Sequence, residues 1–362
     1  MSIASEILKS SETLFSNPDA LDPDFVPKLL PHREGQQQYI ALAIKPLFQD
    51  RNGKNLLIRG ASGIGKTAAT KRVLYDLEEV EESENVPAVF VNCWTQNTTF
   101  KILSNIAHSL GFKFTHNMNT SEILEKVKEI LKKRKGAVLT FDEVDKADDY
   151  DFLYLLSEEI SKKAILLITN DFSFGEDLDP RVKSRLLPEL VEFPEYSLQE
   201  TEDILRERIK YAFYQNVWED AAVKKIAEQA FKFKDIRIGI VLLKVAGELA
   251  ENAANKKIKV EHAEKAIAKT DAIKIKASTD LTDEERLVLD LCKIHAGKIF
   301  GEFYEEYQRS GGKKSDRTVK RLLDKLENRK LIKQEAVTEG LQGRSSKIVY
   351  VGFEKKLNQA HI

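Results

Sequence analysis

The eight residues from Gly60 to Thr67, Gly-Ala-Ser-Gly-Ile-Gly-Lys-Thr, constrain this chain more than any other stretch of it. They match the phosphate-loop pattern G-x-x-x-x-G-K-[ST] in full, and they follow an apolar run and open a helical pattern, as that motif requires. Glycines let successive backbone N–H groups turn towards phosphates, and a helix N-terminus favours negative charge. Lys66 would reach the β- and γ-phosphates of a nucleotide, and the Thr67 hydroxyl would bind Mg²⁺. The expected nucleotide-binding residues are Gly60, Ser62, Gly63, Ile64, Gly65, Lys66, Thr67 and Ala68.

Two acidic residues follow a second apolar run. "AVLTFDEVD" places Asp142 and Glu143 at the carboxyl end of a predicted strand, where open α/β sheets bind ligands. Asp142 is expected to hold the Mg²⁺ shell, and Glu143 to orient and deprotonate an attacking water. The alternative is a loop of solvated carboxylates, which the phosphate loop makes the weaker interpretation.

Three more polar residues end or follow the strand-like run "AILLITN". An amide at Asn170 can hydrogen-bond the γ-phosphate or the attacking water, although turn asparagines commonly end strands. Arg181 and Arg185 lie in "LDPRVKSRLL". An arginine beside a γ-phosphate stabilises transition-state charge and can come from a neighbouring subunit. Solvated surface arginines are the alternative for both.

Short apolar runs alternate with helical patterns between about residues 54 and 193. This alternation predicts an α/β fold with a parallel sheet covered by helices. The runs are continuously apolar, as expected of strands buried on both faces. The expected strands are residues 55–60, 87–93, 136–142, 164–170 and 189–193.

After Pro194 the pattern becomes entirely helical as far as about Ala272. Amphipathic stretches that begin at residues 197, 219, 237 and 259 predict a bundle of four helices. From Thr279, three more helical stretches precede "LIKQEAV" and "KIVYVGF", which read as a hairpin. Helices followed by a two-stranded hairpin describe a winged helix.

One C-terminal stretch, "KKSDRTVKRLLDKL", has apolar residues at i, i+3, i+4 and i+7 on one side and basic residues on the other. In a winged helix it would be the recognition helix, and the wing tip "GLQGRSSK" would reach a minor groove or phosphates. From Ile273 onward there are 19 Lys and Arg against 14 Asp and Glu, whereas the remainder has 38 against 44. A solvated helix face in a protein-packing domain is the alternative. The expected DNA-contacting residues are Ser315, Arg317, Thr318, Lys320, Arg321, Arg344 and Lys347.

Composition excludes several classes of protein. The net charge of −1 does not fit a basic nucleic-acid coat. Cys93 and Cys292 are the only cysteines, so a disulfide framework or a cysteine zinc site is not expected, and a reducing compartment is. The start "MSIASEILKS" lacks the apolar core of a signal peptide, and no run reaches the length needed to cross a bilayer.

The order of these motifs resembles that of the AAA+ ATPases, in which phosphate loop, Asp-Glu strand, sensor asparagine, arginine finger and lid arginine follow one another. Within them the chain resembles the archaeal origin-recognition and cell-division-cycle type replication initiators over nearly its whole length. "DPDFVPKLLPHREGQ" (22–36) is similar to their N-terminal adenine-side segment, and residues 89–111 to their second strand and initiator-specific helix region. The resemblance implies an AAA+ phosphate-loop core, a helical lid and a C-terminal winged helix, with ATP or ADP and Mg²⁺ as cofactors.

Two residues match the family's sensors. Asn170 matches the first sensor, and Arg237, in "KDIRIGIVLL", matches the second. The family usually has Gly-Asp-Ala-Arg at the second sensor, so Lys234 and Ile236 depart from its pattern while the arginine is kept. That departure bears on the angle at which the arginine approaches the nucleotide.

The resemblance also assigns residues at the edges of the site. Arg185 is the first choice for the intersubunit arginine finger, and Arg181 is the second. Tyr196 matches a position that lines the adenine pocket, and Arg208 matches a lid residue near the nucleotide. A tyrosine in the hydrophobic core is the alternative for Tyr196.

The leading functional hypothesis is an ATP-dependent initiator that binds origin double-stranded DNA and helps recruit and load the replicative helicase, with slow hydrolysis as a switch. The alternative is an ATP-gated regulator of transcription or transposition built from the same modules. A third hypothesis is a DNA-binding protein with permanently held ADP. It is disfavoured because a vestigial site would tolerate the loss of its catalytic residues, whereas the chain keeps Lys66, Asp142, Glu143 and Asn170.

The expected domains are a nucleotide-binding core with its N-terminal segment (1–194), a helical lid (195–272) and a winged helix (279–362). The expected partners are origin duplex, the replicative helicase, and further copies or related initiator paralogues on DNA. No membrane partner is expected, and the expected location is the cytoplasm, associated with the nucleoid.

Overall fold

A parallel β-sheet, in the order β2-β3-β4-β1-β5, lies at the centre of the nucleotide-binding region in the computed structural model. The structure describes residues 13–175, 178–279, 283–295, 297–312, 314–328, 332–337 and 345–350. The five strands predicted from apolar runs are confirmed. They are β1 (Leu56–Arg59), β2 (Ala88–Asn92), β3 (Ala137–Asp142), β4 (Lys163–Thr169) and β5 (Glu189–Glu192).

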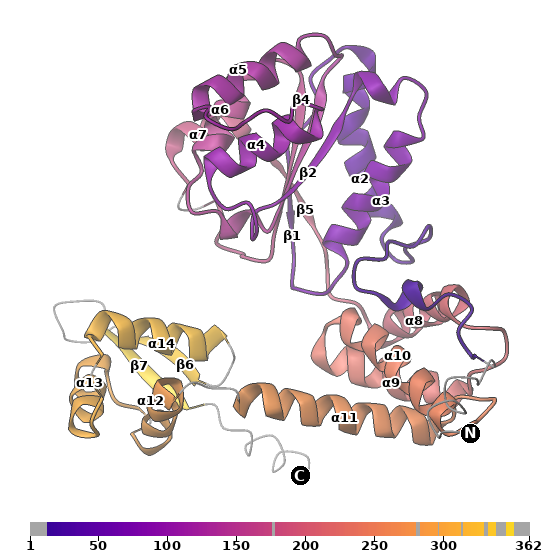
Figure 1. Ribbon diagram of the computed structural model, residues 1–362, viewed down its shortest axis with the longest axis vertical. Coiled ribbons are helices and arrows are strands. Elements are labelled where there is room, and N and C mark those ends of the chain that lie inside the picture. The colour runs from indigo at the N-terminus through magenta and orange to yellow at the C-terminus, as the bar shows by residue number, and fades with distance from the viewer. Residues whose placement is uncertain are drawn as a thin grey trace. The chain divides into compact units, whose positions relative to one another are not determined.

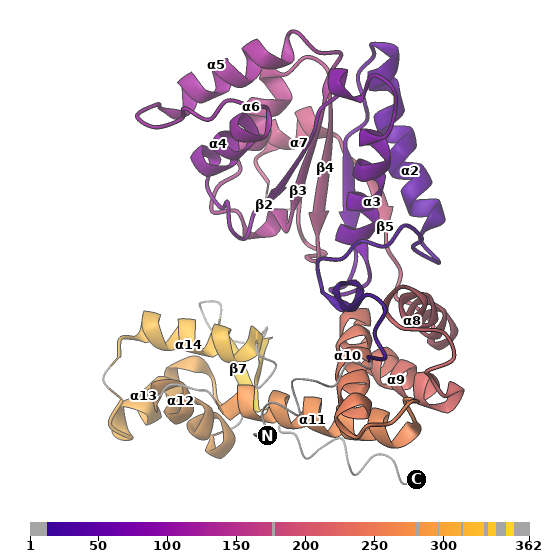
Figure 2. The same ribbon diagram turned by 45° about the vertical axis from the view of Figure 1, so that its right-hand side comes forward.

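Every residue of β3 and β4 is buried, because helices cover both faces of the sheet (Figures 1 and 2). One face packs against α2 (Glu34–Ile44) and α3 (Lys66–Glu78). The other packs against α4 (Thr99–Ser109), α5 (Thr120–Leu131), α6 (Asp151–Glu159) and α7 (Pro180–Leu186). Burial on both faces explains why these strands read as continuous apolar runs.

The parallel arrangement brings polar residues from distant parts of the sequence to one edge of the sheet. The phosphate loop follows β1, Asp142 ends β3, and Thr169 ends β4. In the register of the sheet Arg59 is opposite Thr169, so these strands end at the same level. The sheet therefore delivers the phosphate loop, the Asp142-Glu143 pair and Asn170 to a common edge.

The predicted helical bundle consists of α8 (Leu198–Ala212), α9 (Asp220–Phe233), α10 (Ile236–Asn252) and α11 (Val260–Thr279). Its core also takes in Ala20 and Leu21, from a short 3-10 helix at Pro18–Leu21. The sequence pattern ended the last helix near Ala272, but α11 continues to Thr279. No glycine or proline interrupts residues 260–279, so nothing in the local chemistry stops the helix at the earlier point. Further 3-10 helices lie at Lys45–Gln49, Ser83–Asn85 and Val144–Lys146.

The chain divides into two compact units, Met1–Ile267 (unit 1) and Ala268–Ile362 (unit 2). Unit 2 shows the predicted order of three helices and an antiparallel hairpin, which is the element order of a winged helix. Val319, Leu323 and Leu326 are buried on α14, as the apolar stripe predicts. Among the described residues, no helix combines the length and apolar character needed to cross a membrane. The elements are α12 (Asp283–Ile294), α13 (Phe300–Arg309), α14 (Asp316–Asn328), β6 (Ile332–Val337) and β7 (Ser345–Tyr350).

Candidate nucleotide-binding site

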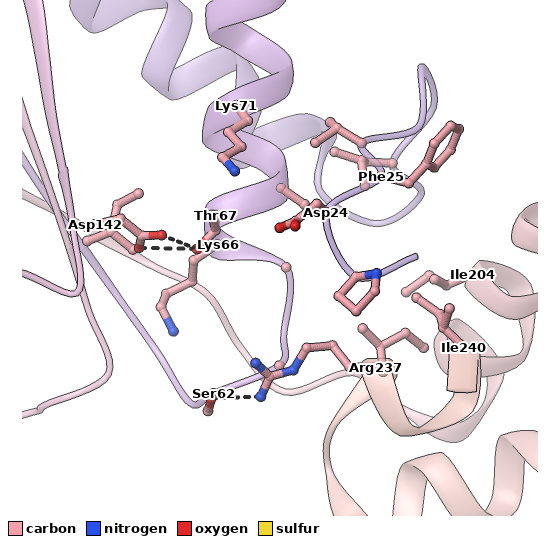
Figure 3. A pocket seen from close by; sticks show the side chains of 18 of the residues that line it. Asp24, Phe25, Ser62, Lys66, Thr67, Lys71, Asp142, Ile204, Arg237 and Ile240 are labelled. Atoms are coloured by element: carbon pink, nitrogen blue, oxygen red, sulfur yellow. Dashed lines mark hydrogen bonds between the residues drawn. The ribbon is translucent and has the colours of Figure 1, made fainter. Parts of the chain in front are cut away.

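A cavity of about 300 Å³ lies in unit 1 at the edge of the sheet where the strands end (Figure 3). The phosphate loop and the ends of β3 and β4 form one side, and an N-terminal segment and the helices α8 and α10 form the other. The structure thus brings together most of the residues singled out in the sequence. Those that line the cavity are Ser62, Gly63, Gly65, Lys66, Thr67, Ala68, Asp142, Glu143, Asn170, Tyr196, Arg208 and Arg237.

The phosphate loop holds the conformation that its glycines allow. Gly63 and Gly65 have φ values of 77° and 88°, in the left-handed region that other residues avoid. Lys66 begins α3, and its ammonium group donates to the main-chain oxygens of Gly60 and Ala61, each at 2.7 Å. Ile64 does not line the cavity, since its side chain is buried in the apolar layer beneath the loop. Of the loop, Ser62, Gly63, Gly65, Lys66 and Thr67 line the cavity.

Burial lowers the pKa of Lys66 to about 8, because only 8% of the residue is exposed and carbonyl oxygens do not compensate its charge fully. The nearby Asp142 carboxylate opposes this effect. A triphosphate would restore the lost stabilisation of the ammonium form, so binding and protonation are linked at this residue.

Nucleotide affinity should therefore fall as the pH rises above about 8, the pKa of Lys66 in the free site. The sign follows because the protonated lysine attracts phosphate and the neutral amine does not. The expected slope is up to about tenfold in dissociation constant per pH unit. Titration with a fluorescent ATP analogue at a series of pH values measures it, with the unfolding temperature of the free protein as the control for folding. A constant affinity across pH 8 would contradict this interpretation.

Asp142 and Thr67 form the part of the cavity that fits a divalent cation. The Thr67 hydroxyl donates to both carboxylate oxygens of Asp142, at 3.2 and 3.0 Å, and the Glu143 N–H donates to one of them at 3.1 Å. Desolvation nevertheless raises the pKa of Asp142, so the buried carboxylate is short of positive charge. No cluster of three His, Cys, Asp or Glu capable of holding a metal occurs in the described part of the chain, but Mg²⁺ commonly binds through one or two protein oxygens plus phosphates.

Glu143 lies beside this pair in a left-handed conformation, with φ of 51°. Desolvation raises the pKa of its carboxyl, and the charges of Asp142 and Asp145 add to that effect. Asp145 accepts a hydrogen bond from the Thr169 hydroxyl at 2.6 Å and so joins the ends of β3 and β4. A carboxylate with a raised pKa is a better proton acceptor than a fully solvated one, which suits a general base.

The lid reaches the phosphate loop through the start of α10. Arg237 pairs with Asp235 at 2.7 Å and donates to the Ser62 hydroxyl at 3.0 Å (Figure 3). The Ile236 N–H donates to the main-chain oxygen of Gly63 at 3.1 Å. The departures from the family pattern thus leave the arginine directed at the loop, while Lys234 turns away to pair with Glu195 at 2.7 Å.

Gly63 packs directly against the start of the lid. A Cβ on Gly63 would lie 2.1 Å from the Oδ1 atom of Asp235, and the positive φ would strain any other residue. We expect Gly63→Ala to displace Asp235 and Arg237 and to weaken ATP binding by about tenfold or more. Equilibrium nucleotide binding measures this effect. Gly35→Ala is the matched control, because a Cβ at Gly35 meets nothing within 4 Å. Equal affinities of the two variants would show that the contact is unimportant.

The other end of the cavity is more apolar. Phe25, Ile204 and Ile240 line it, as suits a purine base (Figure 3). Tyr196 also lines the cavity, and its hydroxyl lies beside the phosphate loop, 3.0 Å from the position of a Cβ on Gly65. Arg208 also lines it, but its guanidinium donates to the main-chain oxygens of Ala20 at 2.8 Å and Phe25 at 3.3 Å. Burial lowers the pKa of Arg208 to about 10. Arg208 therefore holds the N-terminal segment against the lid.

Two charged residues of the cavity were missed in the sequence. Lys71 points into it from α3, four residues after Thr67 and on the same face of the helix (Figure 3). Its charge lowers the pKa of Asp142, against the effect of burial. The spacing of four residues from Thr67 in a predicted helix is the sequence signal that could have identified Lys71. Asp24 enters from the N-terminal segment. The resemblance of residues 22–36 placed that segment at the nucleotide, but it did not single out Asp24.

Neither candidate arginine finger lines this cavity. Arg185, on α7, pairs with Glu158 at 3.0 Å, and 55% of its side chain is exposed. Arg181 pairs with Asp179 at 3.0 Å, and 78% of its side chain is exposed. A residue that acts on a neighbouring subunit must be exposed and must lie outside the cavity of its own chain, and both arginines meet these conditions.

The basic side of α14 is open to solvent. Arg317, Lys320 and Arg321 are exposed, and Thr318 is half-buried. The Ser315 hydroxyl accepts from the Thr318 N–H at 3.4 Å at the start of the helix. Lys347, on β7, is exposed, whereas Arg344 lies outside the described residues.

Comparison with known proteins matches two regions of the chain to family models. Residues 49–173 match an AAA domain, and residues 202–268 match a Cdc6 AAA+ ATPase-type lid domain. An ORC1-type DNA replication protein 1 of Sulfurisphaera tokodaii is 33% identical, over 96% of this chain and 93% of that protein. An ORC1-type DNA replication protein 1 of Archaeoglobus fulgidus is 31% identical, over 99% of this chain and 93% of that protein. The solved structure of the Aeropyrum pernix ORC1 protein in complex with DNA has a TM-score of 0.76 and 28% identity, with 96% of each chain covered.

Proposed function

Because the chain belongs to the family of ORC1-type DNA replication proteins, we propose that it is an ATP-controlled initiator that binds origin duplex. In this proposal the protein helps recruit and load the replicative helicase, and slow hydrolysis acts as a switch. The named relatives are replication proteins along nearly the whole chain, which favours this function over a regulator of transcription or transposition.

The observation that carries the proposal is the contact between lid and phosphate loop. Arg237 and Ile236 hydrogen-bond the loop at Ser62 and Gly63, where a triphosphate would bind. A ligand that competes for these groups, or adds to them, changes the free energy of holding the lid in place. The position of the lid can therefore depend on whether ATP or ADP is bound.

The catalytic part of the proposal assigns one task to each residue. Glu143 accepts the proton of the attacking water, and the Asn170 amide orients that water or the γ-phosphate. Lys66 and Arg237 stabilise the phosphate charge in the same chain, while Arg185, or Arg181 in its place, acts on the site of a neighbouring subunit. Mg²⁺, held by Thr67 and Asp142, would neutralise phosphate charge when bound.

Glu143→Gln should separate binding from turnover. The amide keeps the shape of the side chain and removes the proton acceptor, so we expect ATP affinity within about threefold of wild type and turnover lower by about 10²-fold or more. Lys66→Ala is the opposite control, expected to lose ATP binding itself. Nucleotide binding and phosphate release are measured on both. Normal phosphate release by Glu143→Gln would remove this residue from the mechanism.

The DNA-binding part of the proposal rests on the exposed cations of α14. The Aeropyrum pernix relative is described in complex with DNA. Arg317, Lys320 and Arg321 are exposed on one helix of unit 2, while that helix's apolar side is buried. Cations so placed can pair with phosphates and base edges when the helix enters a major groove. Lys347 and Arg344 would add contacts from the wing.

Removing two of these cations should weaken duplex binding and flatten its salt dependence. We expect Arg317→Ala with Arg321→Ala to lower the slope of log K against log salt by about 2, since each phosphate contact contributes about 0.9. Lys293→Ala with Arg309→Ala is the matched control. It removes the same charge from α12 and α13, where Lys293 pairs with Asp290 and Arg309 with Glu306. Identical slopes for both double variants would exclude α14 as the DNA-binding helix.

The remaining assignments belong to the same proposal. Residues 1–194 form the nucleotide-binding core, residues 195–272 the lid and residues 279–362 the DNA-binding domain. The replicative helicase, further copies and related initiator paralogues on DNA are the proposed protein partners. The proposed location is the cytoplasm, at the nucleoid.

A further inference from the structure

Arg33 is a buried charged residue that the mechanism above does not use. It stands immediately before α2, and only 2% of its surface is exposed. It is not among the residues that line the nucleotide cavity. Its guanidinium nevertheless contacts the phosphate loop, the junction between core and lid, and the ring of Tyr196.

The hydrogen bonds of this guanidinium go to main-chain oxygens. Nε and Nη2 donate to the oxygen of Ile64 at 3.2 and 3.1 Å, and Nη2 also donates to the oxygen of Pro194 at 2.7 Å. Nη1 donates to the oxygen of His32 at 3.1 Å. The guanidinium lies over the ring of Tyr196, 3.8 Å from its centroid. One planar group thus joins three segments far apart in the sequence.

The contact with Ile64 acts on the phosphate-binding groups. The oxygen of Ile64 and the N–H of Gly65 belong to the same peptide plane, in which they point in opposite directions. Fixing the oxygen from behind therefore fixes the direction of the Gly65 N–H. Gly65 lines the cavity, and the phosphate-loop motif uses backbone N–H groups of this kind to bind phosphates. Two hydrogen bonds from one guanidinium to one oxygen define the plane more tightly than a single bond would.

The contact with Pro194 acts on the lid. Pro194 lies between β5 and α8, where the chain passes from the sheet to the lid. Tyr196, two residues later, lines the cavity, and its hydroxyl lies beside Gly65 of the phosphate loop. A rotation of the lid at this point changes the distance between the oxygens of Pro194 and Ile64, which the guanidinium spans.

The chemistry of arginine suits this task and comes at an energetic cost. Burial lowers the pKa of Arg33, and carbonyl oxygens only partly replace the lost hydration. A lysine ammonium lacks the planar fork that binds two oxygens and stacks on a ring at once. Burying a cation in this way costs free energy, which indicates that the geometry of the guanidinium has a role.

We propose that Arg33 is a positioning residue that orients the Ile64–Gly65 peptide towards the nucleotide phosphates and ties it to the junction between core and lid. The inference rests on the proposed ATP-dependent function. In its terms, Arg33 sets nucleotide affinity and transmits the state of the phosphate loop to the lid without touching the nucleotide.

The test uses the full chain and compares Arg33→Met, Arg33→Lys and Arg33→Ala with wild type. We expect the dissociation constant for ATP to rise by about tenfold or more in all three, with turnover at saturating ATP within about threefold of wild type. We also expect millimolar guanidinium chloride, but not sodium chloride, to restore at least a third of the ATP affinity of Arg33→Ala. Arg72→Met is the matched control, since Arg72 is also buried (8% exposed) but pairs with Asp76 on the outer part of α3.

The outcomes separate this inference from the proposed function. Loss of ATP binding in Lys66→Ala but unchanged affinity in Arg33→Met and Arg33→Lys would overturn the role of Arg33 alone. Wild-type protein that binds no ATP would overturn the proposed function. If the Met and Ala variants unfold, Arg33→Lys decides: wild-type affinity in a folded Lys variant contradicts the proposal. Parallel losses of affinity, turnover and unfolding temperature without guanidinium rescue would assign Arg33 to stability only.

Discussion

The contact between α10 and the phosphate loop is the constraint on which the arrangement of the site depends. The Ile236 N–H binds the oxygen of Gly63, and the Asp235 side chain occupies the space that a side chain on Gly63 would need. Glycine is therefore required at this position for two reasons, its backbone angle and its missing Cβ. Since Asp235 also caps α10 and pairs with Arg237, one glycine decides whether the lid arginine can approach the loop.

Much of the fold could be predicted from the sequence because the signals were local. The phosphate loop is defined by its own glycines, and β3 and β4 by continuous apolar runs that only a sheet buried on both faces explains. The parallel order of the strands then places Asp142 and Asn170 near Lys66 without further information. The end of α11 was misplaced because the loss of amphipathic pattern after Ala272 is not a stop signal.

The parts of the site that sequence reasoning missed depend on contacts between distant segments. Arg33 and Asp24 precede Gly60, the start of the phosphate loop, by 27 and 36 residues, and neither belongs to a periodic pattern. Arg208 could be placed in the lid, but its binding to the oxygens of Ala20 and Phe25 follows only from how the N-terminal segment packs. Arg33 and Arg208 are buried, but in the sequence alone they resemble ordinary surface arginines.

The charges of the site also explain why it suits a nucleotide with a divalent cation better than either alone. Burial lowers the pKa of Lys66, while it raises those of Asp142 and Glu143. The site thus places an ammonium group that lacks nearby negative charge close in space to carboxylates that lack nearby positive charge. A triphosphate would stabilise Lys66 but repel Asp142, and a cation alone would do the reverse. Bound together, they compensate both signs of buried charge at once, so the free energy spent on desolvating these groups during folding is recovered when the complete ligand binds.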